Sequence, residues 1–360
     1  MILAWLMPNL HVTGGARVAV ELANGMVERG HRVYILIPAG RNRLQIECKA
    51  EVIECGIRIG SPLWAVPFAL ATMPSRLPQV DLLLASMPPY ALLARSIGRN
   101  TGVPTINYVM NDDVHFFDDR THLKTKWLLA LYRTIARRSI RRGPIMVNSH
   151  WTGVRCVAEK GARPEVIVPH GYDPKRFNCN SLNKKYSGPI RLVTIGRKEC
   201  WKGLPELVTA LNMIDVGANP FILRIISQDQ WDLGSTRFPL EWVKPSGDQD
   251  LVDLYRWGDI FIHSSWFEGF GIPPLEAQAC GLAVVATDSG GIREFLRDSE
   301  NAVIVSPREP RSLARAVLSL IQDGELRGRL IARGLETCCE FTWQRAVDKF
   351  EAYLTSLTSV

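Results

Sequence analysis

The stretch FIHSSWFEGFGIPPLEAQACGLAVVATDSGGIRE, residues 261–294, decides how the rest of the chain is organised. It opens with a short apolar run that ends at Ser264, which predicts a buried strand. A glycine-rich loop follows, and Pro274 stands where a first helical residue is expected, with Gly281 ending the helix. The apolar run 282–287 predicts the next strand. The stretch is therefore a strand, a loop, a helix and a second strand.

Two glutamates, Glu268 and Glu276, stand eight positions apart in this stretch. Glycines let a backbone approach a ligand closely, and a helix N-terminus offers unpaired N–H groups to a phosphate. A carboxylate on the first turn of the helix, Glu276, can accept hydrogen bonds from two neighbouring ribose hydroxyls. Glu268 on the loop would reach a sugar beyond the phosphates. The layout favours capture of a nucleotide that bears a phosphate; the alternative is an ordinary turn with a capping glutamate.

The stretch resembles the signature of family 4 glycosyltransferases, EGFGxPxLEAxACGxxVVAxDxGGxxE, without a gap. The resemblance implies an α/β protein of the GT-B fold, in which two Rossmann-like domains with parallel sheets face each other across an interdomain cleft. In that family the first glutamate binds the donor sugar and the second binds the ribose, which transfers to Glu268 and Glu276. The resemblance also implies that the backbone of one loop faces the donor, namely Gly269, Phe270, Gly271 and Ile272.

Length and composition agree with a two-domain globular protein. A chain of 360 residues is longer than a domain with a single hydrophobic core usually is. Its composition, 46% hydrophobic and 22% charged residues, is ordinary for a globular protein. No apolar run reaches the roughly 18 residues of a spanning helix, and MILAWLMPNL lacks the basic start of a signal peptide. The eight cysteines form no C-x-x-C motif and no His/Cys cluster, so we expect free thiols. These features predict a cytoplasmic protein.

Positive charge is concentrated in the first half of the chain. Residues 1–180 carry 23 Lys and Arg against 13 Asp and Glu, which predicts an anionic partner for the first domain. A helix predicted over 121–142 gathers arginines toward its C-terminal end: Arg133, Arg137, Arg138, Arg141 and Arg142. Each cation there stabilises the helix by about 0.3–1 kcal/mol, which is one explanation. The other is peripheral docking on anionic lipid headgroups at the inner face of the membrane. No recognised module accompanies the charge, so nucleic acid is not expected.

The first domain, predicted over 1–173, opens with a strand at 2–7, a helix at 16–29 and a strand at 33–37. This β-α-β unit lacks G-x-G-x-x-G and has no acidic residue after its second strand, which argues against a dinucleotide site. The family resemblance implies that Gly14 and Gly15, in the first loop, approach the donor phosphates; the alternative is a tight turn before a helix.

The second domain is predicted over 190–342, after a linker at 174–189 that is rich in Asn, Pro and Gly. A strand at 191–195 is followed by Arg197 and Lys202, a cationic pair placed for a diphosphate, with Arg as a fork and Lys as a point charge. The pair resembles the family's G-R-x4-K-G element. Phe341-Thr342-Trp343 resembles the segment after which the final helix, about 343–360, crosses back to the first domain.

The acceptor side is predicted at the end of the strand 105–110. In the family a His-Asp pair is common there, but here Asn111 occupies the place of the histidine and Asp112 follows. The acidic and aromatic residues that come next look closer to the rhamnosyltransferase-like members. The resemblance therefore implies Asp112 as a catalytic residue, with Asn111, Asp113 and His115 as acceptor-side candidates. The alternative is a solvated acidic loop.

Together the residues and the resemblance imply a retaining glycosyltransferase that moves a sugar from a nucleotide-diphosphate donor to an acceptor hydroxyl. The acceptor would be a glycan, a lipid-linked glycan or a small molecule. The catalytic residues would be Glu268, Asp112, Arg197 and Lys202. Family members neutralise the diphosphate with Arg, Lys and helix dipoles, so no metal ion or other cofactor is expected. The alternatives are another GT-B enzyme, such as a sugar-nucleotide epimerase or phosphorylase, or a non-catalytic nucleotide-sugar-binding subunit.

Overall fold

The computed structural model of the chain describes residues 1–11, 13–44, 46–57, 62–115, 126–141, 143–159, 161–179 and 188–358. The chain forms two compact units. Unit 1 comprises Met1–His170 together with Trp343–Val360, and unit 2 comprises Gly171–Thr342. Every helix among the described residues is too short or too polar to span a bilayer.

Unit 1 is built on a parallel sheet with the strand order β3-β2-β1-β4-β5-β6-β7 over its described residues. The strands are β1 (Ile2–Leu6), β2 (Arg32–Pro38), β3 (Glu51–Cys55), β4 (Leu82–Ala85), β5 (Thr105–Val109), β6 (Ile145–Val147) and β7 (Pro164–Ile167). The interiors of β1, β2 and β4, at the centre of the sheet, are buried apolar side chains, as a sheet covered on both faces requires. The order of the strands reverses between β1 and β4, which is the topological switch point of the sheet.

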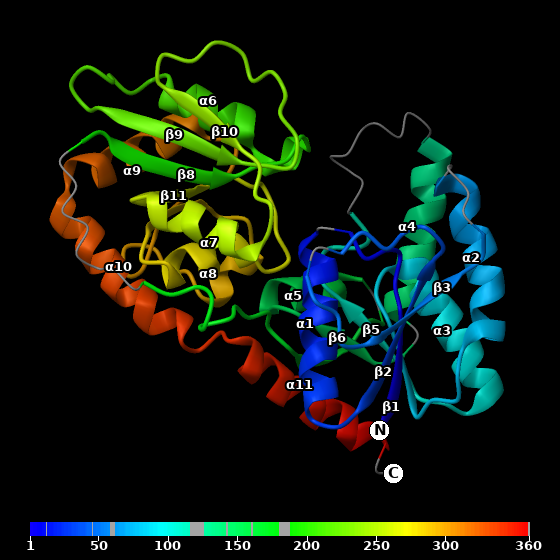
Figure 1. Cartoon of the computed structure of the whole chain (residues 1–360). Coiled ribbons are helices and arrows are strands. Elements are labelled where there is room, and N and C mark those ends of the chain that lie inside the picture. The colour runs from blue at the N-terminus through cyan, green and yellow to red at the C-terminus, as the bar shows by residue number, and fades with distance from the viewer. Residues whose placement is uncertain are drawn as a thin grey trace. The chain divides into compact units, whose positions relative to one another are not determined.

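Helices cover both faces of this sheet. They are α1 (Gly14–Glu28), α2 (Pro62–Arg76), α3 (Pro88–Thr101), α4 (Lys126–Arg141), α5 (His150–Ala158) and α11 (Trp343–Thr358). Helices α1 and α11 lie on one face, and α2, α3 and α4 lie on the other (Figure 1). The first helix begins with a side-chain cap, because Thr13 Oγ1 accepts a hydrogen bond from the Ala16 N–H at 3.3 Å.

The final helix, α11, is part of unit 1 and packs on α1. Its buried residues recur at helical spacing: Trp343, Ala346, Val347, Phe350 and Leu354. Phe350 is 1% exposed and stacks on Trp5 of β1, with ring centroids 5.9 Å apart. Glu351 accepts a hydrogen bond from Arg29 at 2.5 Å and contacts His31 Nε2 at 2.7 Å. Apolar burial and a partly exposed ionic cluster together hold α11 on unit 1.

Unit 2 is built on a second parallel sheet, with the order β10-β9-β8-β11-β12-β13 over the described residues. The strands are β8 (Ile190–Ile195), β9 (Phe221–Ile226), β10 (Leu240–Val243), β11 (Ile260–His263), β12 (Ala283–Thr287) and β13 (Val303–Val305). The helices are η1 (Cys200–Lys202), α6 (Leu204–Leu211), α7 (Asp248–Trp257), α8 (Ile272–Ala279), η2 (Gly291–Glu294), α9 (Pro310–Gln322) and α10 (Gly324–Cys338). Two parallel sheets covered by helices confirm the predicted α/β class.

Helices α2 and α10 are absent from the sequence-based assignment. Helix α2 contains Pro67 and Pro74, which break the usual helix signal. Helix α10 contains three glycines, and its start is marked by Asp323, whose side chain accepts a hydrogen bond from the Leu326 N–H at 2.8 Å. Packing against neighbouring elements overrides weak propensity in both helices.

Several predicted boundaries differ from the observed ones by a few residues. The predicted helix 121–142 is observed as α4, Lys126–Arg141, while residues 121–125 and Arg142 lie outside the described residues. The helix expected to start at Pro274 begins at Ile272, because Gly271 takes the left-handed N-cap conformation. Part of the predicted linker, residues 180–187, also lies outside the described residues.

We predict that Phe350→Ala lowers the stability of unit 1 by about 3–5 kcal/mol, because it leaves a cavity against Trp5 in a buried contact. Amide hydrogen exchange followed by mass spectrometry should show lost protection in β1 and α11. The matched control is Tyr353→Phe on the same helix, which removes only a hydroxyl bonded to Glu165. Equal protection in both variants would contradict the docking role of Phe350.

Candidate functional site

Lys202 and Glu268 form an ion pair in unit 2. Lys202 ends the short helix η1 after β8, and Glu268 lies in the loop after β11, the neighbouring strand of the sheet. Lys202 Nζ donates to Glu268 Oε1 at 2.5 Å, and the two side chains are 22% and 18% exposed. Carboxyl ends of parallel strands meet at one edge of a sheet, so residues 66 positions apart in sequence become direct partners.

The surroundings keep Glu268 ionised. Burial by itself would raise the pKa of the carboxyl, but the Lys202 ammonium, His263 and the hydrogen bonds from Lys202 and Ser265 together outweigh burial, and the pKa falls to about 2. His263, the last residue of β11, lies 3.3 Å from Ser289 Oγ through its Nε2. Burial lowers the pKa of His263 to about 4, so this imidazole is neutral at pH 7. The site therefore holds one carboxylate and one ammonium beside a neutral histidine.

The backbone around Lys202 is fixed against the loop that carries Glu268. Ser264 Oγ donates to the Lys202 carbonyl at 2.7 Å, and the Trp266 N–H donates to the Trp201 carbonyl at 2.7 Å. Gly203 has φ +65°, and a Cβ there would lie 2.0 Å from the Ser264 carbonyl oxygen. Only glycine fits this position, which explains the glycine that follows the lysine.

The backbone of Glu268 is held by a second loop, the one after β12. The Glu268 N–H donates to the Ser289 carbonyl at 2.7 Å, and the Glu268 carbonyl accepts from the Gly291 N–H at 3.0 Å. A Cβ on Gly291 would lie 2.1 Å from the Gly269 carbonyl oxygen, so the two loops touch backbone to backbone. Close packing therefore requires glycine at 291, and at 290 the positive φ of 87° favours glycine.

Glu276 lies on the first turns of α8 and points into the protein. It is 3% exposed, and its Oε2 accepts a hydrogen bond from the Tyr255 hydroxyl at 2.9 Å. Phe270 is 1% exposed and packs against Phe295 and Phe341, with centroids 5.2 and 6.0 Å away. Its side chain is a core residue, so only its backbone remains for the predicted contact with a donor.

The remaining predicted residues of unit 2 surround the start of α8 and the end of β8. Gly269, Gly271 and Ile272 are buried, and Arg197 is exposed just beyond the carboxyl end of β8. Arg197 thus lies on the same edge of the sheet as Lys202 and Glu268. Their roles toward a donor stay predictions.

In unit 1, Asp112 lies in the loop after β5 and is 9% exposed. Its Oδ2 accepts a hydrogen bond from Arg155 Nε at 2.5 Å, and His115 Nδ1 lies 3.1 Å from both carboxylate oxygens. Arg155 also reaches His115 Nδ1 at 3.1 Å. The predicted catalytic candidate is thus part of an Asp–Arg–His cluster and not of a solvated acidic loop.

Asp113 differs from its neighbour. Its Oδ2 is buried without a hydrogen-bond partner among the described residues. Burial and the Asp112 carboxylate raise the pKa of Asp113 to about 7. Asn111 Oδ1 accepts a hydrogen bond from the Asp112 N–H at 2.9 Å. The loop therefore pairs a fixed carboxylate, Asp112, with a carboxyl that is partly protonated at neutral pH.

Gly14 and Gly15 form the start of α1, next to the same edge of the unit 1 sheet. A Cβ on Gly14 would meet no atom within 4 Å, and one on Gly15 would meet only Met110 Cε at 3.8 Å. Neither glycine has the left-handed backbone that excludes other residues. The packing of the described residues therefore leaves both glycines unexplained.

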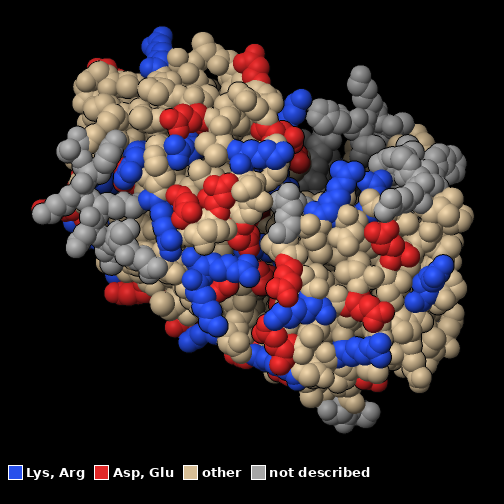
Figure 2. All heavy atoms as spheres, viewed as in Figure 1, with Lys and Arg blue, Asp and Glu red and all other residues tan. Residues whose placement is uncertain are grey.

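The basic helix α4 is partly neutralised. Arg137 and Arg141 both pair with Glu159, at 3.1 and 2.9 Å. Arg138 is exposed, Arg133 is half-buried and Arg142 lies outside the described residues. Basic and acidic side chains are interspersed on the face that Figure 2 shows, so the positive charge of the first half does not form one large patch there.

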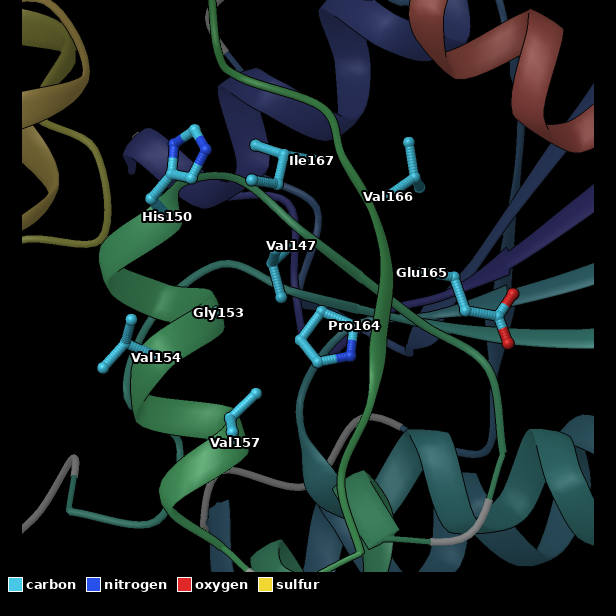
Figure 3. A pocket seen from close by; sticks show the side chains of 9 residues that line it. All are labelled: Val147, His150, Gly153, Val154, Val157, Pro164, Glu165, Val166 and Ile167. Carbon is cyan, nitrogen blue, oxygen red and sulfur yellow. The ribbon is translucent and has the colours of Figure 1, made fainter.

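A hollow in unit 1 lies between α5 and the strands β6 and β7 (Figure 3). Its lining is mostly apolar and includes Val154 and Val157, which are 67% and 60% exposed. No predicted site residue contributes to its lining. Chemistry is therefore not assigned to this hollow.

Arg155, His263 and Tyr255 contact predicted site residues but were not predicted themselves. In the sequence Arg155 looks like an ordinary basic residue near the C-terminus of a helix, and Tyr255 looks like a core residue of a helix, so neither is marked as functional. His263 could have been predicted as a site residue, because a histidine that ends an apolar strand lies at the carboxyl edge of the sheet. Among the described residues, no group of three or more His, Cys, Asp or Glu could hold a metal ion.

Two family models match consecutive parts of the chain. The model described as "Glycosyltransferase Family 4" matches residues 12–186, and "Glycosyl transferases group 1" matches residues 180–337. The second match contains Lys202, Glu268 and the loops that hold them. The chain belongs to the family 4, group 1 glycosyltransferases.

Several proteins are similar to this chain in sequence or in fold. A D-inositol 3-phosphate glycosyltransferase of Salinispora arenicola is 37% identical over 108 residues, which are 30% of this chain and 24% of that protein. The chain thus spans about a quarter of the length of this curated relative. Sucrose-phosphate synthase from Thermosynechococcus elongatus has a TM-score of 0.85 at 16% identity, over all of both chains. Anabaena HepE in complex with UDP-glucose has a TM-score of 0.78 at 15% identity, over 99% and 100% of the two chains. These likenesses confirm the predicted GT-B fold.

We predict that Lys202→Met raises the pKa of Glu268 above its usual 4.5, because burial then acts without the compensating ammonium. In the native protein the folded pKa lies below the unfolded one. The carboxylate therefore stabilises the fold above about pH 4.5 and loses this effect as pH falls toward 2. The variant should melt at a lower temperature than the parent. This difference in melting temperature should be largest at pH 7 and should become smaller as the pH falls toward 4.

The control for this titration is Lys175→Met, which alters an exposed lysine of the same unit. It should leave the pH dependence of the melting temperature unchanged. A Lys202→Met deficit that stays constant from pH 7 to pH 4 would refute the coupling between Lys202 and Glu268.

Proposed function

We propose that this glycosyltransferase moves a sugar from a nucleotide-diphosphate donor to an acceptor hydroxyl, with retention at the anomeric carbon and without a metal ion. The Lys202–Glu268 ion pair at the carboxyl edge of the unit 2 sheet carries the proposal. A fixed ammonium beside a fixed carboxylate offers one group to a phosphate oxygen and one to sugar hydroxyls. Both residues lie within the part of the chain that the group 1 model matches.

In this proposal Lys202 and Arg197 stabilise the negative charge that develops on the leaving diphosphate. Glu268 accepts hydrogen bonds from the hydroxyls of the donor sugar and fixes its orientation. Glu276 accepts from the ribose hydroxyls, for which it would exchange or share its present bond from Tyr255. The leaving phosphate itself takes the proton from the acceptor hydroxyl.

Gly14 and Gly15 would approach the donor phosphates. Support comes from the open space around both positions, since neither packing nor backbone conformation requires glycine there. A ligand that comes close to the backbone is the remaining reason for two small residues at a helix start.

Asp112 is proposed to act on the acceptor hydroxyl, with Asn111, Asp113 and His115 around it. Arg155 holds the Asp112 carboxylate in place, which suits a group that accepts a hydrogen bond from the attacking hydroxyl. The similarity of this loop to rhamnosyltransferase-like members has no counterpart among the relatives named above. We therefore infer a UDP-linked hexose as the first donor to test, because HepE was solved with UDP-glucose.

We predict that Glu268→Gln lowers kcat by about 10²–10³-fold while UDP affinity changes less than threefold, because the carboxylate acts on the sugar and not on the nucleotide. Turnover of UDP-glucose with a panel of acceptors, and calorimetric UDP titration, measure the two quantities. Turnover of the native enzyme should be the same with and without EDTA.

The matched control is Glu241→Gln, which alters an exposed glutamate of the same unit that pairs with Arg224. It should retain native turnover. Unchanged turnover in Glu268→Gln would refute the role of this residue. Turnover without any acceptor would favour an epimerase, and UDP-glucose binding with no turnover on any acceptor would favour a non-catalytic subunit.

We also propose that α4 is the membrane-facing element of a peripheral enzyme. Trp127 and Leu131 are 64% and 51% exposed on this helix, one turn apart, and arginines follow toward its C-terminal end. An exposed tryptophan beside basic residues suits the headgroup region of an anionic bilayer. The pairing of Arg137 and Arg141 with Glu159 reduces the charge that remains for lipid.

We predict that the Trp127→Ala/Leu131→Ala double variant binds vesicles of phosphatidylglycerol and phosphatidylcholine at least fivefold more weakly than the parent in a sedimentation assay. The control is Val154→Ala, which shortens another exposed apolar side chain of unit 1. Equal binding by the double variant and the control would contradict the proposal. Binding that is as strong to phosphatidylcholine alone would exclude an electrostatic contribution.

A further inference from the structure

A group of four residues lies at the carboxyl edge of the unit 1 sheet and has no part in the proposed chemistry. We name it the switch-point cluster: His11, Arg41, Arg43 and Tyr90. His11 lies in the loop after β1, and Tyr90 lies in the first turn of α3, after β4. Strand order reverses between β1 and β4, and open parallel sheets bind ligands in the crevice outside such a point.

Two polar atoms of the cluster are buried without a partner. Tyr90 is 2% exposed, and its hydroxyl has no hydrogen-bond partner among the described residues. The same holds for Nε2 of His11. A buried polar atom without a hydrogen bond lowers stability, so such atoms are rare in native proteins unless something else satisfies them. These two come from opposite sides of the switch point, where open parallel sheets bind their ligands.

Two arginines are held beside these atoms by the backbone. The Leu10 N–H donates to the Arg41 carbonyl at 2.9 Å, and the Arg43 N–H donates to the Leu10 carbonyl at 2.8 Å. Arg41 is half-buried and Arg43 is exposed. Over the part of the chain that the structure describes, neither guanidinium has a carboxylate within 4.0 Å. The nearby Glu54 carboxylate accepts a hydrogen bond from the Gly40 N–H at 2.8 Å instead.

The two arginines also affect the pKa values of the neighbouring groups. Burial lowers the pKa of His11, and Arg43 and Arg41 lower it further. Burial raises the pKa of Tyr90, and Arg41 opposes this shift. Arg41 therefore lies close enough to act on both His11 and Tyr90, and its charge is not compensated by a carboxylate among the described residues.

We propose that the switch-point cluster binds an oxyanion, a phosphate monoester or a carboxylate, that is part of the acceptor. Arg41 and Arg43 supply guanidinium forks for two oxygens, and the Tyr90 hydroxyl and a ring N–H of His11 supply further donors. The assignment to the acceptor rests on the proposed function, in which the donor diphosphate has its own cations, Arg197 and Lys202, in unit 2. The acceptor of this enzyme is accordingly an anionic sugar or polyol and not a neutral one.

The first test compares three probes on the full-length protein by calorimetry: glucose 6-phosphate, glucuronate and glucose. At least one anion should bind tenfold or more tightly than glucose, and the tighter of the two anions identifies the oxyanion. Arg41→Gln and Arg43→Gln should each weaken that anion at least tenfold. The control is Arg32→Gln, an exposed arginine at the opposite end of β2, which should change nothing.

The second test uses Tyr90→Phe, which keeps the ring and removes the buried hydroxyl. The melting temperature of the free protein should stay the same or rise, because the lost hydroxyl has no partner there. Affinity for the anion should fall about 3–10-fold, since a hydrogen bond to a charged group is lost. A tyrosine with a purely structural role would give the opposite pattern, with lower stability and unchanged affinity.

Equal affinity of the native protein for glucose and both anions, or no binding of any probe, would overturn the proposal. So would anion binding that is lost in Lys202→Met but kept in Arg41→Gln, because the probe would then occupy the donor site. UDP titration separates the two proposals. UDP affinity should be unchanged in Arg41→Gln, and a native protein that binds the anion but not UDP would disprove the donor assignment while leaving the anion site in place.

Discussion

The salt bridge between Lys202 and Glu268 is the interaction on which the unit 2 site depends. Two opposite charges in a largely buried place are tolerated only when each compensates the other and when the geometry is fixed. Three loops supply that geometry. The turn after β8 is bonded to the loop after β11, which is bonded in turn to the loop after β12. Glycines at 203 and 291 are required because the backbones touch at these points.

In both units the ionisable groups lie at the carboxyl edge of a parallel sheet, but the groups themselves differ. In each, a parallel sheet buried on both faces leaves only the carboxyl ends of its strands for polar function. Unit 2 places an ammonium and a carboxylate there. Unit 1 places the Asp112–Arg155–His115 cluster after β5 and the switch-point cluster after β1, β2 and β4. Long apolar strands thus give rigidity, and the loops that follow them carry the ionisable groups.

The fold, and the position of the candidate residues of unit 2 at the ends of its strands, were predictable from the sequence for a local reason. Strands of the unit 2 sheet are short apolar runs, the helix after Gly271 begins with prolines, and glycines mark the turns, so each signal lies within a few residues. Helices α2 and α10 were not predictable, because prolines and glycines weaken the local signal and tertiary packing alone maintains the helices. Whether Asp112 lies in a solvated acidic loop, the alternative to the predicted acceptor side, could be decided only by its contact with Arg155, 43 residues away in the chain.

The sequence by itself determined the α/β class, the family resemblance and the identity of the charged residues, because these follow from local patterns of apolar, glycine and acidic positions. Tertiary structure alone decided which charges meet. In the structure Lys202 pairs with Glu268, and Glu276 accepts a hydrogen bond from Tyr255. The Phe270 side chain is buried in an aromatic core. The Tyr90 hydroxyl has no hydrogen-bond partner among the described residues. The physical reason is that pairing, burial and pKa shifts depend on distances across neighbouring strands, and strand order is set by the packing of the whole sheet.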